Sequence, residues 1–319
     1  MTSEHLPKEL APSDRPFPWH AQVAKFIDEN GTPDLSGSKL IIASDSRMKD
    51  GYVIDSVLCT NEKNFLEWAK RSVQIREHHA LDEHGLHYKS LRYGSTFWNA
   101  LWPSLHSACL MEGVAVVMRT KKSLVDENIS IVEALLAAGL GSTNHDWKAK
   151  QFTEMVGVSS LVGAVVGAVS SPEQDVHWIS DHEPPFGKDD QREDILNFIG
   201  RATGLSTPHG LGRASLITPL LVADQPLWAR DFVAVVDLFA GGVGDALEDA
   251  KMDETGERAL WKPGDDKRRS MKSGIISNWF WLDNFNPLKR LAVDVELSKN
   301  DSGDRKFSVS WVKSLTEHA

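Results

Sequence analysis

Residues 39–59, KLIIASDSRMKDGYVIDSVLC, join two apolar runs through a polar segment, and this pattern decides the class of fold. The runs at 39–43 and 52–59 have the length and apolar character of β-strands, so together they predict a β-hairpin. The polar residues 48–51 would form its turn. We therefore expect Asp45, which follows the first run, to lie near the tip of the hairpin.

The rest of the chain alternates helical patterns with further apolar runs. Helices are predicted at 64–76, 97–111, 129–140, 153–169, 192–203 and 227–248. Strands are predicted at 114–118, 176–180, 216–222, 291–297 and 307–312, the last two as a C-terminal β-hairpin. Such alternation favours an α/β domain with a sheet flanked by helices. We expect an N-terminal arm (1–37), an α/β domain (38–250) and a basic linker with the C-terminal hairpin (251–319).

Composition limits the class of function. The 319 residues are 41% hydrophobic and 25% charged, which excludes a disordered or collagen-like chain. The formal net charge of −10 argues against a protein that coats nucleic acid by bulk charge. Residues 251–319 nevertheless hold slightly more Lys and Arg than Asp and Glu, so a local basic contact stays open.

Several features favour a cytoplasmic protein. Cys59 and Cys109 lie far apart without metal-binding spacing, as is typical of reduced thiols. Residues 1–18 lack the apolar stretch of a secretory signal. The longest run without charge, 155–172, is rich in Gly and Ser, so it predicts a buried helix and no membrane partner.

Three acidic residues stand out by their position. Asp45 and Asp181 each follow a predicted strand, where an α/β sheet presents functional side chains. Asp237 lies among apolar residues of a predicted helix, where a carboxylate is costly to bury unless it is paired or binds a metal. Gly241 and Asp245 share its helical face, and the glycine would allow a close approach. The alternative is that Asp237 simply points to solvent.

Carboxylates of this kind are suitable ligands for Mg²⁺ or Mn²⁺. Two such ions about 4 Å apart activate water and stabilise the leaving oxygen in phosphodiester cleavage. The acidic residues therefore predict a metal site, and the reaction class that it favours is phosphodiester hydrolysis or transfer.

Five short motifs occur in an order that is typical of one family. They are Ser44-Asp45-Ser46, Gly85-Leu86-His87-Tyr88-Lys89, Trp178-Ile179-Ser180-Asp181-His182-Glu183, Leu221-Val222-Ala223-Asp224 and Val236-Asp237-Leu238-Phe239-Ala240-Gly241. In this order, residues 38–250 resemble the domain-of-unknown-function 3800 family, a ribonuclease H-like group found in bacteria and mobile elements. The resemblance implies a ribonuclease H-like mixed sheet. It also implies a metal site built from Asp45, Asp181, Asp224 and Asp237.

Two departures from the family pattern bear on activity. Gly85 stands where the family has a Glu, which removes a potential metal ligand; Glu83 or His87 could replace it. Arg47 lies beside Asp45, where it could bind a phosphate or neutralise the acid. With both departures, an alternative stays open in which the site has lost its activity.

Histidines and basic residues supply further candidates. His78, His79, His84 and His87 form a His-rich segment without standard zinc spacing. His87 directed at the acidic site would instead serve as a proton shuttle, and so as a catalytic residue beside Asp45, Asp181 and Asp237. The candidates for phosphate contact are Arg47, Lys89, Arg213, Lys267, Arg268 and Arg269. The alternative for the last three is a solvated linker.

The function that these features favour is a nuclease, a hydrolase dependent on Mg²⁺ or Mn²⁺, with DNA or RNA as its partner. The alternative is a catalytically inactive ribonuclease H-like scaffold that binds a protein or nucleic-acid partner in a defence or mobile-element system. A third option is an enzyme that acts on a small molecule in the same cleft.

Overall fold

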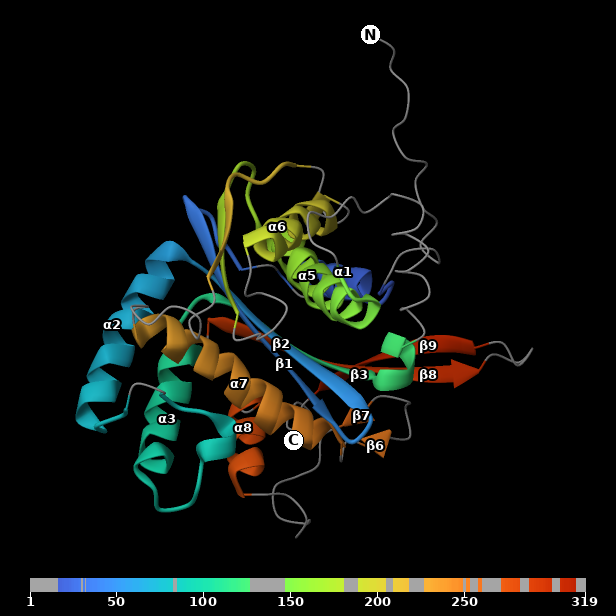
Figure 1. Cartoon of the computed structure of the whole chain (residues 1–319). Helices are drawn as coiled ribbons and strands as arrows, with labels where there is room; N and C mark the ends of the chain where they lie inside the picture. The colour runs from blue at the N-terminus through green and yellow to red at the C-terminus, as the bar shows by residue number, and fades with distance from the viewer. Residues whose placement is uncertain are drawn as a thin grey trace, which may run out of the picture.

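The computed structural model in Figure 1 describes most of the chain. The described residues are 17–29, 31, 33–82, 85–126, 147–180, 189–204, 209–217, 227–248, 251–252, 258–259, 271–281, 287–299 and 305–313. The predicted helix at 129–140 and the end of the predicted strand at 216–222 lie outside these ranges.

One mixed sheet organises the described part of the chain. Its strand order is β5-β4-β1-β2-β3-β8-β9-β7-β6. The strands are β1 (Lys39–Lys49), β2 (Tyr52–Asn61), β3 (Gly113–Lys121), β4 (Asp175–Ser180), β5 (Ala214–Ile217), β6 (Lys251–Met252), β7 (Arg258–Ala259), β8 (Leu288–Lys299) and β9 (Arg305–Lys313). This arrangement confirms the prediction of an α/β fold with a mixed sheet flanked by helices.

Strand directions change twice across the centre of the sheet. β1, β2 and β3 pair antiparallel in succession, whereas β4 runs parallel to β1 and β5 runs parallel to β4. On the other side, β8 pairs parallel with β3 and antiparallel with β9. The C-terminal hairpin predicted from the sequence is therefore present, and it continues the central sheet.

The first hairpin is longer than predicted. Lys49 pairs with Tyr52, which leaves Asp50 and Gly51 as a two-residue turn with φ of 48° and 82°. Asp-Gly favours such turns because both residues tolerate positive φ. Asp45 consequently pairs with Ser56 inside β1, so its predicted place near the hairpin tip is wrong.

Helices cover both faces of the sheet (Figure 1). On one face lie α2 (Glu62–His78), α3 (Thr96–Cys109), α7 (Leu227–Glu248) and α8 (Met271–Trp281), with the short 3₁₀-helix η2 (Tyr88–Ser90). On the other lie α1 (His20–Glu29), α5 (Ala149–Val169) and α6 (Asp189–Gly204). We call these the α7 face and the α5 face.

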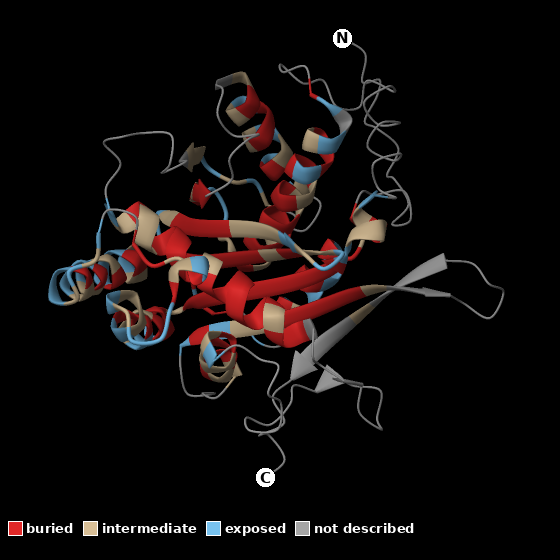
Figure 2. Ribbon diagram, turned by 60° about the horizontal axis from the view of Figure 1, so that its bottom comes forward, coloured by how far each residue is buried: buried red, intermediate tan, exposed pale blue. Residues whose placement is uncertain are grey.

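Alternation along β1 divides its side chains between two hydrophobic clusters. Ile41 and Ala43 pack with α7, whereas Leu40 and Ile42 pack with α5. This period of two is the expected pattern for a strand with helices on both sides. Figure 2 shows the resulting buried residues along the central strands and on the inward sides of the helices.

Other sequence predictions succeed or fail for identifiable reasons. α7 has the predicted bounds, because its long apolar pattern is unbroken by proline. α8 begins inside the stretch predicted as a linker, because its apolar residues surround the helix and show no amphipathic period. The segment Lys150–Val169 of α5 is long and apolar enough to cross a membrane, but 78% of its most apolar window is buried in the protein.

Candidate functional site

The first acidic residue of the site comes from β1. Ser44 is the last β1 residue that pairs with β4, opposite Ser180, and its hydroxyl donates to the Ser180 hydroxyl at 3.2 Å. Asp45 is therefore the first residue beyond this pairing. By the alternation that directs Ala43 toward α7, Asp45 and Arg47 also lie on the α7 face.

Asp237 of α7 is held by the segment that precedes η2. Its Oδ2 accepts a hydrogen bond from the Tyr88 backbone N–H at 2.8 Å and lies 3.3 Å from His87 Nδ1. The Asp237 side chain is 20% exposed. The alternative that this carboxylate simply points to solvent is wrong, since two groups hold it in place.

Gly241 lets Tyr88 pack directly on α7. A Cβ at this position would overlap the Tyr88 ring, so the close approach requires glycine. The Tyr88 hydroxyl reaches one turn further and donates to Asp245 Oδ2 at 2.7 Å. Asp237, Gly241 and Asp245 thus share the helical face predicted from their spacing, and that face fixes the position of Tyr88.

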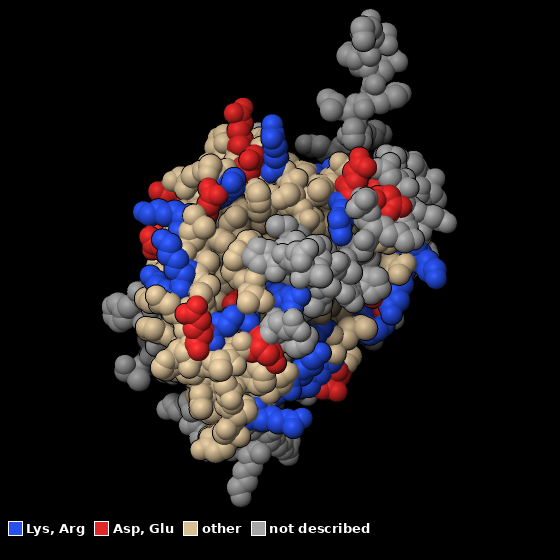
Figure 3. All heavy atoms as spheres, turned by 60° about the vertical axis from the view of Figure 1, so that its left-hand side comes forward, with Lys and Arg blue, Asp and Glu red and all other residues tan. Residues whose placement is uncertain are grey.

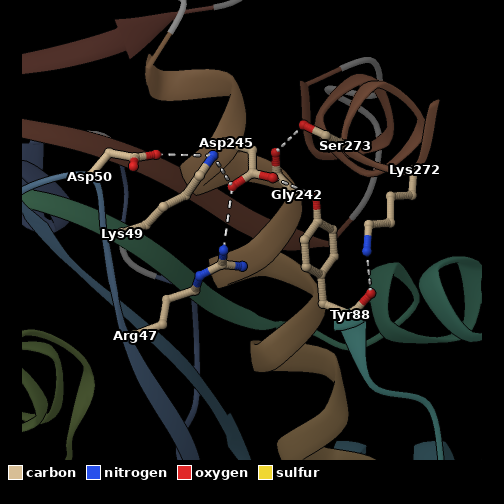
Figure 4. Close-up of polar contacts among 8 residues, drawn as sticks. All are labelled: Arg47, Lys49, Asp50, Tyr88, Gly242, Asp245, Lys272 and Ser273. Carbon is tan, nitrogen blue, oxygen red and sulfur yellow. Dashed lines mark hydrogen bonds and ion pairs between the residues drawn. The ribbon is translucent and has the colours of Figure 1, made fainter. Parts of the chain in front are cut away.

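Basic side chains surround the Tyr88 ring, as Figure 4 shows. Lys272 Nζ lies 4.1 Å from the ring centroid and donates to the Tyr88 carbonyl at 2.8 Å. The Arg47 guanidinium lies 5.3 Å from the same centroid, and it pairs with Asp245 at 3.5 Å. Burial lowers the pKa of Lys272; the charge of Asp245 opposes this shift and that of Arg47 adds to it.

These residues open onto one cavity of about 870 Å³, which we call the acidic pocket. The side chains that the argument uses are Asp45, Arg47, His87, Lys89, Asp237 and Lys272. They come from β1, from the η2 region, from α7 and from α8. Asp82 also lines the pocket, so the fold brings together three acidic residues, a histidine and three cations from distant parts of the sequence.

The predicted site residues divide into three groups. Asp45, His87 and Asp237 line the acidic pocket, together with the proposed phosphate contacts Arg47 and Lys89. Outside the described residues lie Asp181, Asp224, Lys267, Arg268, Arg269, Glu83 and His84. His78 and His79 lie at the end of α2 with their ring centroids 4.8 Å apart, and they do not line the pocket.

Arg213 lies at the other end of β4. It precedes β5, its carbonyl accepts from the Val176 N–H, and its own N–H donates to Asp175 Oδ1 at 2.7 Å. Asp175 is level with Lys39 in the parallel register, six residues before Asp45. At about 3.3 Å per residue this separation is about 20 Å, so Arg213 is remote from the acidic pocket.

The backbone explains the absence of a Glu at position 85. Gly85 has a φ of 68°, where a residue with a side chain would be strained. A Cβ there would also lie 3.0 Å from Arg76 Nη2 and 3.1 Å from Asp231 Oδ1, which form a buried ion pair. The local conformation therefore suits glycine.

Sequence reasoning included Lys272 only as the end of a basic run, and it missed the anchoring role of Tyr88. Lys272 is the last residue of the basic run that begins at Lys267, so the run itself was the signal. Tyr88 follows His87 directly, but its packing against Gly241 depends on how α7 meets η2. The spacing of residues in the sequence does not predict this contact between Tyr88 and Gly241.

The donor types in the acidic pocket suit a hard divalent cation. Asp45 and Asp237 offer carboxylate oxygens and His87 an imidazole nitrogen, which are ligands for Mn²⁺, and the carboxylates also for Mg²⁺. Within the described residues, no group of three or more such side chains is close enough to form a complete site.

Basic and acidic side chains are interspersed over the face seen in Figure 3.

Comparison with known proteins does not assign the chain to a family. No protein-family model matches the chain, and a search of curated proteins gave no match. The resemblance to the domain-of-unknown-function 3800 family therefore stays a prediction based on its motifs.

Proposed function

We propose that this protein is a divalent-metal-dependent nuclease or phosphodiester-transfer protein with a ribonuclease H-like core. The observation that carries the proposal is that Asp45 of β1 and Asp237 of α7 line one pocket with His87. The strand order β3-β2-β1-β4-β5, with β1–β3 antiparallel and β4 and β5 parallel to β1, supports a core of this type.

Asp45 and Asp237 would hold the metal. Asp181 is the next proposed ligand, because it directly follows Ser180, which pairs with the residue before Asp45. Asp224 is included because of the family motif that contains it. When bound, a divalent cation would lower the pKa of a coordinated water and stabilise charge on the leaving oxygen.

The other residues of the pocket would position the substrate, exchange protons with it and offset its negative charge. His87 lies 3.3 Å from Asp237 and is part-exposed, so it can exchange a proton with the reacting group. Lys89 and Arg47 line the same pocket and would contact the phosphate oxygens. Tyr88 fixes these groups through its packing on Gly241 and its hydrogen bond to Asp245.

Cleavage assays test this proposal. Single- and double-stranded DNA and RNA would be incubated with the full chain in Mg²⁺ or Mn²⁺. We expect metal-dependent cleavage that Asp45→Asn and Asp237→Asn reduce by at least about a hundredfold, because each removes a charge from the site.

Asp50→Asn is the matched control. Asp50 lies on the same hairpin as Asp45 with a φ of 48°, which Asn also tolerates. It should cleave as the wild type does. Cleavage that survives in Asp237→Asn would overturn the assignment of the site.

The inactive scaffold is the second candidate. It is favoured by Gly85, whose backbone excludes the expected Glu, and by the cations Arg47 and Lys272 within the same pocket as the acidic residues. These cations could offset the negative charge that a metal would need. A scaffold of this kind would bind nucleic acid without cleaving it, and its affinity would not depend on Mn²⁺.

A further inference from the structure

A second cavity lies on the α5 face, between the sheet and the helices α1 and α5. It has a volume of about 440 Å³, within the range of small-molecule sites. Its apolar lining includes Trp19, Met118 and Val158. The acidic pocket is lined instead by residues from η2, α7 and α8, so β1 contributes to two cavities whose other walls differ.

Two residues that line this second cavity carry buried polar atoms without partners. His20 is 3% exposed and Thr120 is 1% exposed. Among the residues that the structure describes, the two ring nitrogens of His20 have no hydrogen-bond partner. The Thr120 hydroxyl has none among them either. Nearly all buried polar groups in native proteins have a partner, so these atoms indicate groups that a ligand would satisfy.

The chemistry of the cavity favours a ligand that donates hydrogen bonds. Asp55, which is half-buried, lines it with its carboxyl hydrogen-bonded to Ser46; burial raises the pKa of Asp55 to about 6. Burial also lowers the pKa of His20 to about 3, so its ring is neutral and offers one donor and one acceptor.

The basic residues at the rim are already paired. Lys122 contacts Asp126 at 2.6 Å, Lys150 lies 3.8 Å from Glu154, and Arg47 pairs with Asp245 on the α7 face. An anionic ligand would therefore face the half-buried Asp55 carboxylate, while the cations at the rim are already paired. A ligand with amino N–H donors suits Asp55 better.

Aromatic side chains complete the wall. Phe17 stacks on His20 with the ring centroids 5.3 Å apart, and Trp19 meets Phe17 edge-on at 5.6 Å. A flat aromatic ligand could pack on these rings with little loss of its own conformational freedom.

We propose that this cavity binds an uncharged or singly cationic amino-heteroaromatic molecule, of nucleobase or nucleoside size. Its amino group donates to Asp55, and its ring heteroatoms meet His20 and Thr120. Asp45 and Arg47 line both cavities, but the residues proposed to bind this ligand differ from the proposed metal ligands, so the proposal holds whether or not the protein cleaves nucleic acid.

Titration calorimetry of the full chain tests the proposal. The probes are adenine, cytosine, adenosine and 2-aminopyridine, with benzoate as a flat anionic control. At least one of the amines should bind at one site per chain, and benzoate should not bind.

Two substitutions remove the unpartnered polar atoms while keeping the shape of the side chain. His20→Phe and Thr120→Val should each weaken binding by about tenfold or more. Both variants should melt at the wild-type temperature or higher, because each removes a buried polar group that lacks a protein partner. Asp237→Asn, in the acidic pocket, should bind the ligand as the wild type does.

Three results would overturn the proposal. They are that none of the four amines binds, that benzoate binds as tightly as they do, or that His20→Phe and Thr120→Val both bind with wild-type affinity. Loss of nuclease activity in Asp237→Asn with normal amine binding would separate this site from the proposed metal site.

Discussion

On the α7 face of β3, Arg119 donates to both carboxylate oxygens of Asp294 at 2.9 and 2.7 Å, and its guanidinium lies 4.3 Å from the Tyr52 ring centroid. The next residue, Thr120, is directed to the α5 face, where its hydroxyl has no hydrogen-bond partner among the described residues. Both residues are nearly fully buried. Of two adjacent buried residues in one strand, one thus has its polar group hydrogen-bonded within the described part of the chain and the other does not.

A similar contrast holds between β1 on the α7 face and α1 on the α5 face. On the α7 face, Arg47 and Lys49 pair with Asp245, whose other oxygen accepts from Tyr88. On the α5 face, the wall of the second cavity includes His20 of α1, whose ring nitrogens have no hydrogen-bond partner among the described residues. Arg47, Lys49 and Asp245 thus have partners within the protein, whereas His20 and Thr120 have none for their polar side-chain atoms among the described residues. In the acidic pocket, charged groups are therefore already held in place by the protein. In the second cavity, polar groups lack a partner among the described residues, which a ligand would supply.

The largest effect on stability is expected from breaking the Arg119–Asp294 pair. Arg119→Met leaves the Asp294 carboxylate, which is 1% exposed, without its partner. Removing one member of a buried pair costs about 3–5 kcal/mol. Urea unfolding monitored by circular dichroism would measure the loss.

The double variant Arg119→Met/Asp294→Leu is its control. Since it leaves no uncompensated charge, it should recover a large part of that loss. A single variant that unfolds at the same urea concentration as the wild type would mean that the pair does not hold β8 to β3.

A smaller loss is expected from Gly241→Ala. The added methyl group overlaps the Tyr88 ring, so the helix and η2 must separate, at a cost of about 1–3 kcal/mol. Gly274→Ala on α8 is the matched control, because a Cβ there meets nothing within 4 Å. It should stabilise the protein by about 0.5–1 kcal/mol. Equal effects of the two substitutions in thermal unfolding would contradict the close packing on α7.

The α5 face predicts a pH dependence of stability. His20 has a folded pKa of about 3, below its ordinary value of 6.5, so below pH 6.5 the unfolded chain binds a proton that the folded chain does not. Its contribution to stability is present above pH 6.5 and is lost as the pH falls toward 3, by about 1.4 kcal/mol per pH unit.

His20→Phe isolates this contribution. The wild type should lose more stability than the variant between pH 6.5 and 4, and a control at the exposed His106 should follow the wild type. Parallel curves for the wild type and His20→Phe, measured by urea unfolding at each pH, would disprove the buried neutral ring.

The smallest effect is expected from Thr120→Val. The substitution removes a buried hydroxyl that has no protein partner and retains the shape of the side chain, so it should stabilise the ligand-free protein by up to about 1 kcal/mol. Ser44→Ala is the contrasting case, because the Ser44 hydroxyl contacts both Ser180 and Trp178. It should destabilise the protein. Thermal unfolding of the two variants would sharpen the difference between satisfied and unsatisfied buried hydroxyls.

Local patterns in the sequence predicted much of the fold. The apolar run of α7 predicted Leu227–Glu248 with its bounds, and the apolar runs predicted the central strands. The extent of β1 was missed because the Asp50-Gly51 turn was not used to set the register. α8 was missed because it is apolar around its whole circumference, so it shows no helical period.

The site was less accessible to sequence reasoning. Spacing along α7 predicted that Asp237, Gly241 and Asp245 share a face, and the structure confirms this through their contacts with Tyr88 and His87. That Asp45 and Asp237 line one pocket depends on how α7 packs on β1, which brings together segments that are distant in the sequence. The cavity on the α5 face depends on α1 and on unpartnered atoms, which have no signature in the sequence.

Binding of Mn²⁺ tests the central claim most directly, because it requires no knowledge of the substrate. Calorimetric titration of the full chain should give a site that Asp45→Asn and Asp237→Asn each abolish or weaken by at least about tenfold, equivalent to about 1.4 kcal/mol. Asp50→Asn should bind Mn²⁺ as the wild type does, with circular dichroism showing that all variants are folded. A wild-type chain that binds no Mn²⁺, or variants at Asp45 and Asp237 that bind it unchanged, would contradict a metal site in the acidic pocket.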